Sequence, residues 1–169
     1  MTADEFTKEH ERDFFLTGKK SYEISIAMSD RHETFHNDLE DADYKAAPGD
    51  IVLMGTVGEK WCSELDHVLA SYRLPNGATL TESYLRANRG HFIRVRTDSG
   101  RKNCFACRVP PKISFRIETC WSTLTVNRPG VDHGKGDFLV CEASAKGRPD
   151  FSRLWSVNGR VFENTYAMP

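Results

Sequence analysis

The stretch Pro48-Gly49-Asp50-Ile51-Val52-Leu53 is matched later in this chain by Gly136-Asp137-Phe138-Leu139-Val140. In both, a Gly-Asp turn signal is followed at once by a run of apolar residues. Glycine permits a turn with positive φ, and the Asp side chain accepts hydrogen bonds from backbone amides where the strand begins. We therefore predict a core strand beginning at Ile51 and an equivalent strand beginning at Phe138.

Aromatic residues downstream of these two stretches repeat as well. Trp61 precedes Tyr72, and Trp155 precedes Tyr166, with the same spacing of 11 residues in both copies. The Asp-to-Trp distance is 11 in the first copy and 18 in the second, and the extra residues fall at 143–149, where the composition favours a loop. We predict an internal duplication in which both Tyr rings are buried. The alternative is two unrelated hairpins that share common turn chemistry.

The residues Pro48-Gly49-Asp50-Ile51-Val52, Gly58-Glu59-Lys60-Trp61 and Tyr72 form a pattern that resembles short bacterial and phage-borne modules of uncharacterised function. The second copy resembles the same pattern without the first Pro and the Gly-Glu pair. The shared positions are turn and core residues. The resemblance therefore implies a fold unit of bacterial or phage origin and implies no activity.

Elsewhere, apolar residues alternate with polar ones, which is typical of strands. This alternation predicts strands over 22–28, 91–97, 102–109 and 113–121, the last with a bulge or bend near 120–124. Residues 2–16 are charged with interspersed Phe and predict a short N-terminal helix, while residues 29–47 are polar and predict a loop or a short capped helix.

These elements predict a strand-rich α+β protein with two related small antiparallel β units and a short N-terminal helix. The expected boundaries are residues 1–18 for the helix, 19–85 for an acidic first β unit and 86–169 for a basic second β unit.

Charge is distributed unevenly. Residues 1–85 hold 8 Lys/Arg and 17 Asp/Glu, a net −9, and residues 86–169 hold 15 Lys/Arg and 7 Asp/Glu, a net +8. Such asymmetry indicates either an anionic partner or two halves that face each other.

The segment 86–116 is the most basic part of the chain and the predicted contact surface. The predicted binding residues are Arg86, Arg89, Arg94, Arg96, Lys102 and Arg108. Phe92, Phe105 and Phe115 are interleaved with them, as in platforms that bind single-stranded nucleic acid. The alternative is that these rings form the buried face of the same strands. The expected partner is a protein or a single-stranded nucleic acid.

The composition argues against a membrane-spanning protein and against a secreted protein. No stretch approaches the ~20 apolar residues that a membrane span requires, and residues 1–10 are acidic, unlike a signal peptide. The cysteines are five in number and irregularly spaced: Cys62, Cys104, Cys107, Cys120 and Cys141. An odd count without an export signal predicts reduced thiols in a cytoplasmic protein.

Two short motifs suggest chemistry. His32-Glu33-Thr34-Phe35-His36 matches H-E-x-x-H, which on a helix places two imidazoles and a general base around Zn²⁺. Its charged flanks and the lack of an evident third ligand count against it. Cys104 and Cys107 form a lone C-x-x-C, and in a strand they point to opposite faces. We predict a non-catalytic binding protein without a cofactor; the alternative is a zinc-dependent hydrolase that uses His32, Glu33 and His36.

Overall fold

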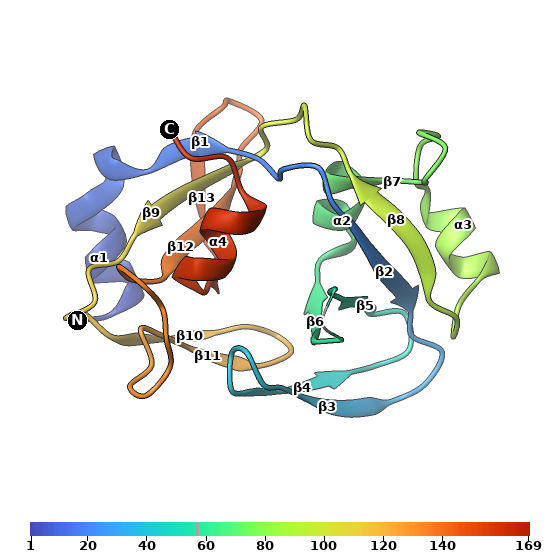
Figure 1. Cartoon of the computed structure of the whole chain (residues 1–169), viewed down its shortest axis with the longest axis horizontal. Coiled ribbons are helices and arrows are strands. Elements are labelled where there is room, and N and C mark those ends of the chain that lie inside the picture. Colours follow the sequence, from blue (N-terminus) through green and yellow to red (C-terminus); the bar gives the residue numbers. More distant parts are fainter. Residues whose placement is uncertain (57) are drawn as a thin grey trace. The chain divides into compact units, whose positions relative to one another are not determined.

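The computed structural model describes residues 1–56 and 58–169. It divides the chain into two compact units (Figure 1). The contiguous unit is Ser21–Ser99, and the split unit combines Met1–Lys20 with Gly100–Pro169. This division differs from the predicted boundaries at 18 and 85, because strand pairing joins residues 93–97 to the first unit and residues 15–17 to the second.

The contiguous unit is built on a five-stranded antiparallel sheet in the order β6-β5-β2-β8-β7. Its strands are β2 (Glu23–Met28), β5 (Ile51–Met54), β6 (Lys60–Ser63), β7 (Tyr72–Arg73) and β8 (Ile93–Thr97). The remaining elements are helices α2 (Leu65–Ser71) and α3 (Glu82–Ala87) and a hairpin of β3 (Glu33–Asn37) with β4 (Ala42–Ala46). The core lies on one face of the sheet, where Ile26 and Leu53 pack with Val68 of α2 and Leu85 of α3.

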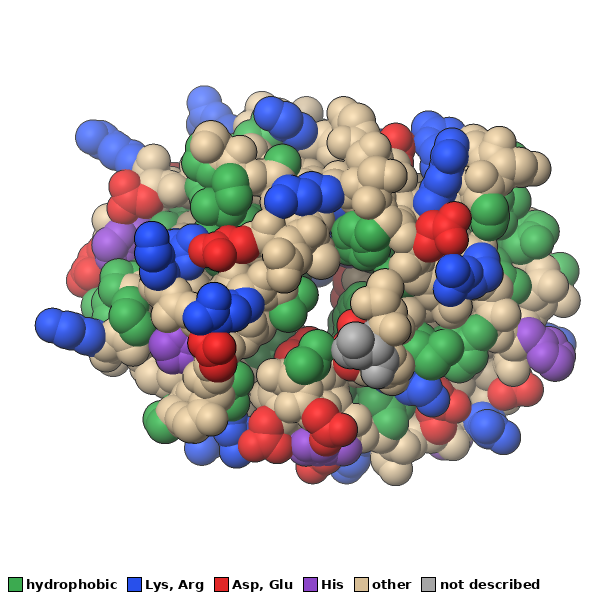
Figure 2. Space-filling model, in the orientation of Figure 1, with side chains coloured by type: hydrophobic (Ala, Val, Ile, Leu, Met, Phe, Trp, Pro, Cys, Tyr) green, Lys and Arg blue, Asp and Glu red, His purple; other side chains and the backbone are tan. Residues whose placement is uncertain are grey.

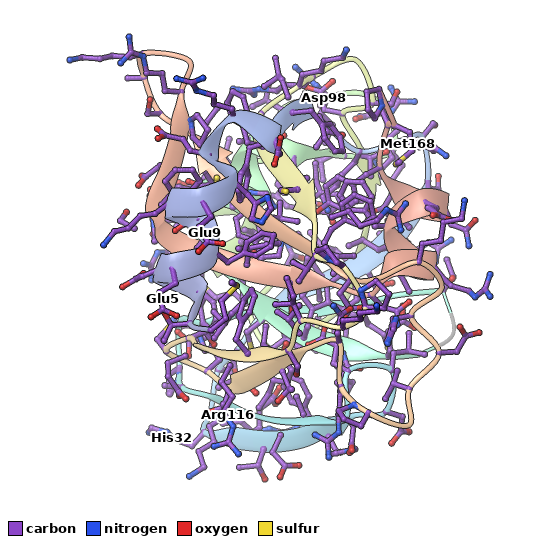
Figure 3. All side chains as sticks on the ribbon, turned by 90° about the vertical axis from the view of Figure 1, so that its left-hand side faces the viewer. Glu5, Glu9, His32, Asp98, Arg116 and Met168 are labelled. Atoms are coloured by element: carbon purple, nitrogen blue, oxygen red, sulfur yellow. The ribbon has the colours of Figure 1, made fainter. Side chains whose placement is uncertain are left out.

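The split unit is built on a four-stranded antiparallel sheet in the order β1-β9-β12-β13. Its strands are β1 (Phe15–Thr17), β9 (Cys104–Arg108), β12 (Phe138–Ala143) and β13 (Pro149–Val157). The other elements are α1 (Ala3–His10), a 3₁₀ turn (Glu11–Asp13), α4 (Gly159–Thr165) and a hairpin of β10 (Phe115–Glu118) with β11 (Thr123–Val126). Helix α1 turns Glu5 and Glu9 outward (Figure 3) and buries Phe6, whose ring lies 5.6 Å from that of Phe115.

The two sheets share one register at the predicted repeat. Trp61 lies opposite Leu53 in the contiguous unit, and Trp155 lies opposite Val140 in the split unit. Gly49 and Gly136, which precede the two strands, have φ of 92° and 120°, values that favour glycine. The strands predicted to begin at Ile51 and Phe138 begin at those residues.

Each repeat continues into a seven-residue helix that the sequence analysis did not predict. The helices α2 and α4 end in the same way: the Tyr72 amide donates to the Val68 carbonyl, and the Tyr166 amide donates to the Phe162 carbonyl. Both Tyr side chains are buried, at 1% and 3% exposure, which confirms the predicted burial.

The neighbouring strands extend this correspondence. β2 pairs with β5 as β9 pairs with β12, so that Ile26 and Ala106 occupy matching places. β8 then pairs with β2 as β1 pairs with β9. The chain order differs, because β8 follows α2 within the contiguous unit, whereas β1 comes from the N-terminal end of the chain. The split unit therefore has the same pattern of strand pairing as the contiguous unit, but its strands follow a different order along the chain.

Three sequence expectations are wrong. Residues 29–47 contain the β3–β4 hairpin instead of a loop or helix, and the stacked rings of Phe35 and Tyr44 lie opposite each other across it. The predicted long strand over 113–121 is the first arm of the β10–β11 hairpin, so the shift in apolar phase marks a turn. The N-terminal helix ends at His10 rather than Leu16, because Phe15 and Leu16 pair with β9.

Candidate functional site

The contiguous unit has a second sheet face, opposite the core, which we call the outer face. Ile24, Ile26 and Val95 point toward the core, so the alternate residues of β2 and β8 point the other way. Cross-strand pairing places Arg94, Ser25, Met54 and Lys60 in one row of this face and Arg73, Arg96 and Glu23 in the next. The β3–β4 hairpin contacts β6 and covers the far end of the face.

Four cations therefore lie on the outer face, and two of them have acidic partners. Arg94 pairs with Glu23 at 3.1 Å, and Arg73 pairs with Asp98 at 3.2 Å. Arg96 forms no ion pair within residues 1–56 and 58–169. Figure 2 shows basic and acidic side chains mixed over the region of β8. The two rows that hold these cations are polar and only partly neutralised, whereas the next row of the face, Ala27, Val52 and Cys62, is buried.

Phe92 adds an exposed ring beside these cations. It is 40% exposed, and the Lys60 ammonium lies 5.5 Å from the centre of its ring. Such cation–π contacts contribute about 0.5–1 kcal/mol at exposed sites. Of the three interleaved Phe residues, Phe115 is buried and Phe105 is half-buried, so only Phe92 is an exposed aromatic of the predicted platform.

The matching positions of the split unit carry apolar residues. In the shared register, Leu16 occupies the position equivalent to Arg94, and Phe105 the position equivalent to Ser25. Leu154 likewise occupies the position equivalent to Lys60. The same backbone arrangement thus forms without cations at these places. The basic side chains of the outer face are therefore not a requirement of the fold.

The six predicted binding residues are divided between the two units. Arg86 and Arg89 lie in and just after α3, Arg94 and Arg96 lie on β8, and all four are exposed. Arg86 pairs with Glu82 at 2.8 Å. Lys102 and Arg108 belong to the split unit.

The Arg108 side chain contacts helix α4 and a core ring of the split unit. Its guanidinium lies 2.7 Å from Glu163 on α4 and 4.4 Å from the centre of the Phe138 ring. The half-buried side chain therefore ties α4 to the sheet. The pKa of Glu163 is lowered by this hydrogen bond from Arg108.

The charge asymmetry is smaller when it is counted by structural unit. The contiguous unit holds 8 Lys/Arg and 13 Asp/Glu, a net −5, and the split unit holds 15 Lys/Arg and 11 Asp/Glu, a net +4. Within the contiguous unit, however, the charges separate. The β3–β4 hairpin holds five acids and one cation, Lys45, whereas β8 holds Arg94 and Arg96 and no acid.

The H-E-x-x-H motif does not lie on a helix. His32 precedes β3, and Glu33 and His36 lie on that strand, so the spacing that serves a zinc site on a helix does not apply. Nδ1 of His36 lies 2.7 Å from Asp43, and Nε2 lies 3.0 Å from Asp41. The hydrogen bond with Asp43 is the main cause that raises the pKa of His36 above 6.5. Over the described ranges, no group of three or more His, Cys, Asp or Glu side chains is arranged to hold a metal ion.

The C-x-x-C pair of β9 points to two sides of the sheet. Cys104 belongs to the core beside α4, and Cys107, three residues later, faces the other way. Burial raises the pKa of the Cys104 thiol to about 11 and those of Cys107 and Cys141 to about 12. These three thiols act as small apolar side chains and are poor nucleophiles at neutral pH.

One buried cation lies in the split unit. Lys19 is 8% exposed, and its ammonium donates to the Tyr166 hydroxyl at 2.8 Å. The matching place beside Tyr72 in the contiguous unit holds Thr97. Sequence reasoning missed this pair, because 147 residues separate its members.

None of the helices formed by residues 1–56 and 58–169 has the length and hydropathy needed to cross a membrane. Comparison of the chain with protein-family models, with curated proteins and with solved structures finds no match. The resemblance to bacterial and phage modules stays an expectation from the sequence.

Proposed function

We propose that this protein acts by binding, and that its contact surface for an anionic partner is the outer face of the contiguous unit. The observation that carries the proposal is the comparison of matching positions. Arg94 and Lys60 are exposed or half-exposed cations where the split unit has Leu16 and Leu154 on the same backbone plan. Surface side chains that the fold does not require are free to contact a partner.

The local charge of the outer face supports an anionic partner. Glu23 and Asp98 neutralise two of the four cations only through exposed or half-exposed ion pairs, and exposed pairs contribute about 0–1 kcal/mol each. An incoming phosphate or carboxylate can replace such partners at little cost. The acidic hairpin of the same unit limits the attraction to this face and disfavours indiscriminate binding of polyanions.

We also propose that the two units arose by duplication of one ancestral unit. Support comes from the common register around Trp61 and Trp155 and the common helix ends at Tyr72 and Tyr166. In this view the last strand of the split unit came to stand at the start of the chain as β1. One unit was then able to keep a structural surface while the other acquired a binding surface.

The proposed contact surface is tested by neutralising it. The Arg94→Gln/Arg96→Gln variant removes two exposed cations and introduces no new acid, so the fold should persist. We expect it to elute from heparin, used as a model polyanion, at clearly lower salt than the wild type. The matched control is Lys112→Gln/Arg116→Gln in the split unit, where both residues are exposed and Arg116 projects from β10 (Figure 3).

The control variant should elute close to the wild type, and all three proteins should have similar melting temperatures. Equal shifts for the two double variants would show that heparin senses only net charge. A wild type that does not bind heparin at low salt would also contradict the proposal.

A further inference from the structure

The outer face carries an aromatic ring as well as cations, and this combination narrows the class of partner. We propose that the anionic partner is a single-stranded nucleic acid, with one base stacked on Phe92 and adjacent phosphates bound by Lys60, Arg94 and Arg96. This inference rests on the proposed binding function of the outer face and adds the identity of its ligand class.

The geometry of β8 supports this ligand. Arg94 and Arg96 are alternate residues of β8 on the outer face, so their side chains lie about 7 Å apart along the strand, and Phe92 directly precedes this strand. Lys60 approaches the Phe92 ring from β6 at 5.5 Å. A ring and several cations are thus presented together, which matches a ligand that repeats a flat base and a charged phosphate.

An exposed Phe distinguishes this surface from one that binds only acidic side chains. The carboxylates of an acidic peptide would pair with the cations, and the Phe92 ring would stay exposed to water. Its counterpart Phe14 in the split unit is buried and packs edge-on against Phe151 at 5.0 Å. The ring at this position is therefore buried in one unit and 40% exposed in the other.

A duplex fits the outer face less well than a single strand. Its bases are stacked on one another, and their faces are not accessible to a ring on a sheet surface. An open sheet with an exposed aromatic is the arrangement by which single strands are bound, with little dependence on sequence.

The test measures binding of a labelled 12-nucleotide deoxythymidine oligomer and its uridine equivalent by fluorescence anisotropy. Phe92→Leu keeps an apolar side chain but removes the stacking surface, and we expect it to weaken binding by about 5- to 150-fold, the range for loss of one base–aromatic stack. Phe92→Trp should restore or exceed wild-type affinity. The matched control is Tyr84→Leu, which removes an aromatic of similar exposure from α3 and should leave the affinity unchanged.

Salt dependence separates the roles of the ring and the cations. Arg96→Gln should reduce the slope of log K against log salt by about 0.7, the contribution of one phosphate contact to a single strand. Phe92→Leu should lower affinity without changing that slope.

The outcomes distinguish the inference from the proposed function. Unchanged affinity in Phe92→Leu, or a duplex bound as tightly as the single strand, would overturn the inference. If a poly-glutamate peptide binds and neutralising Arg94 and Arg96 abolishes that binding while neither oligomer binds, the function stands with a protein partner and the inference is wrong. If neither oligomer nor peptide binds, the inference is wrong, and the function stands only if heparin binding depends on Arg94 and Arg96.

Discussion

The contiguous and split units have one strand plan and two different surfaces. Around the Trp61 and Trp155 pairs the registers agree, and the following helices end at a buried Tyr in both. On the face opposite the helix, Arg94 and Lys60 in one unit correspond to Leu16 and Leu154 in the other. The comparison separates residues that the fold requires from residues that it tolerates. Each unit is an internal control for the other.

The largest expected difference lies at the Asp that precedes the first repeated strand. Asp137 is buried and accepts hydrogen bonds from the amides of Asn127 at 2.7 Å and Gly159 at 3.1 Å. Asp50 is half-buried and accepts from the Ala47 amide at 2.8 Å. Because a hydrogen bond to a charged group contributes about 1.5–3 kcal/mol, Asp137→Ala should destabilise the protein by roughly 3 kcal/mol or more.

Asp50→Ala should lower the free energy of unfolding by about half as much as Asp137→Ala, since it removes one such hydrogen bond at a more solvated site. Urea denaturation of the two variants measures both values. Equal losses of stability would contradict the expected difference between the two units, because they would show that the additional hydrogen bond between Asp137 and α4 contributes nothing to stability.

Part of this plan could be predicted from the sequence. The Gly-Asp turns and the apolar runs after them have a local cause, so the strands at Ile51 and Phe138 began where expected. The helices α2 and α4 were missed, because seven residues are fewer than the window over which apolar periodicity distinguishes a helix from a strand. The partner of β9 could not be found either, since β1 pairs across about ninety residues of intervening chain.

The candidate site, too, could be predicted only where its residues are close together in the sequence. Alternation placed Arg94 and Arg96 on one exposed face, which the structure confirms. Lys60 was missed because it joins them only through the pairing of β6, β5, β2 and β8. The ion pair of Arg108 could not be foreseen, because its acidic partner, Glu163, lies 55 residues away.

A smaller difference is expected between the two inserted hairpins. The turn of β3–β4 is held by His36 through Asp43 and Asp41, whereas the turn of β10–β11 is held by the hydroxyl of Thr119, which does not titrate in this range. The pKa of folded His36 lies above its unfolded value of 6.5, mainly because of Asp43. Its stabilisation is therefore fully present below pH 6.5 and is lost as pH rises through the folded pKa.

Amide hydrogen exchange across that pH range should show the β3–β4 turn opening more readily at high pH after correction for intrinsic rates. The β10–β11 turn should not change. In His36→Gln the difference should disappear. Two turns with the same pH response would contradict the proposed role of His36.

The central claim is that the outer-face cations serve binding while the fold does not need them. The most direct measurement uses the Lys60→Leu/Arg94→Leu variant, which places the leucines of the split unit at the two equivalent positions of the contiguous unit. Both the free energy of unfolding and polyanion binding are measured. The account predicts a free energy of unfolding within about 1 kcal/mol of the wild type, since an exposed ion pair contributes little, together with a clear loss of affinity for heparin. Retained affinity, or a loss of stability above about 2 kcal/mol, would contradict it.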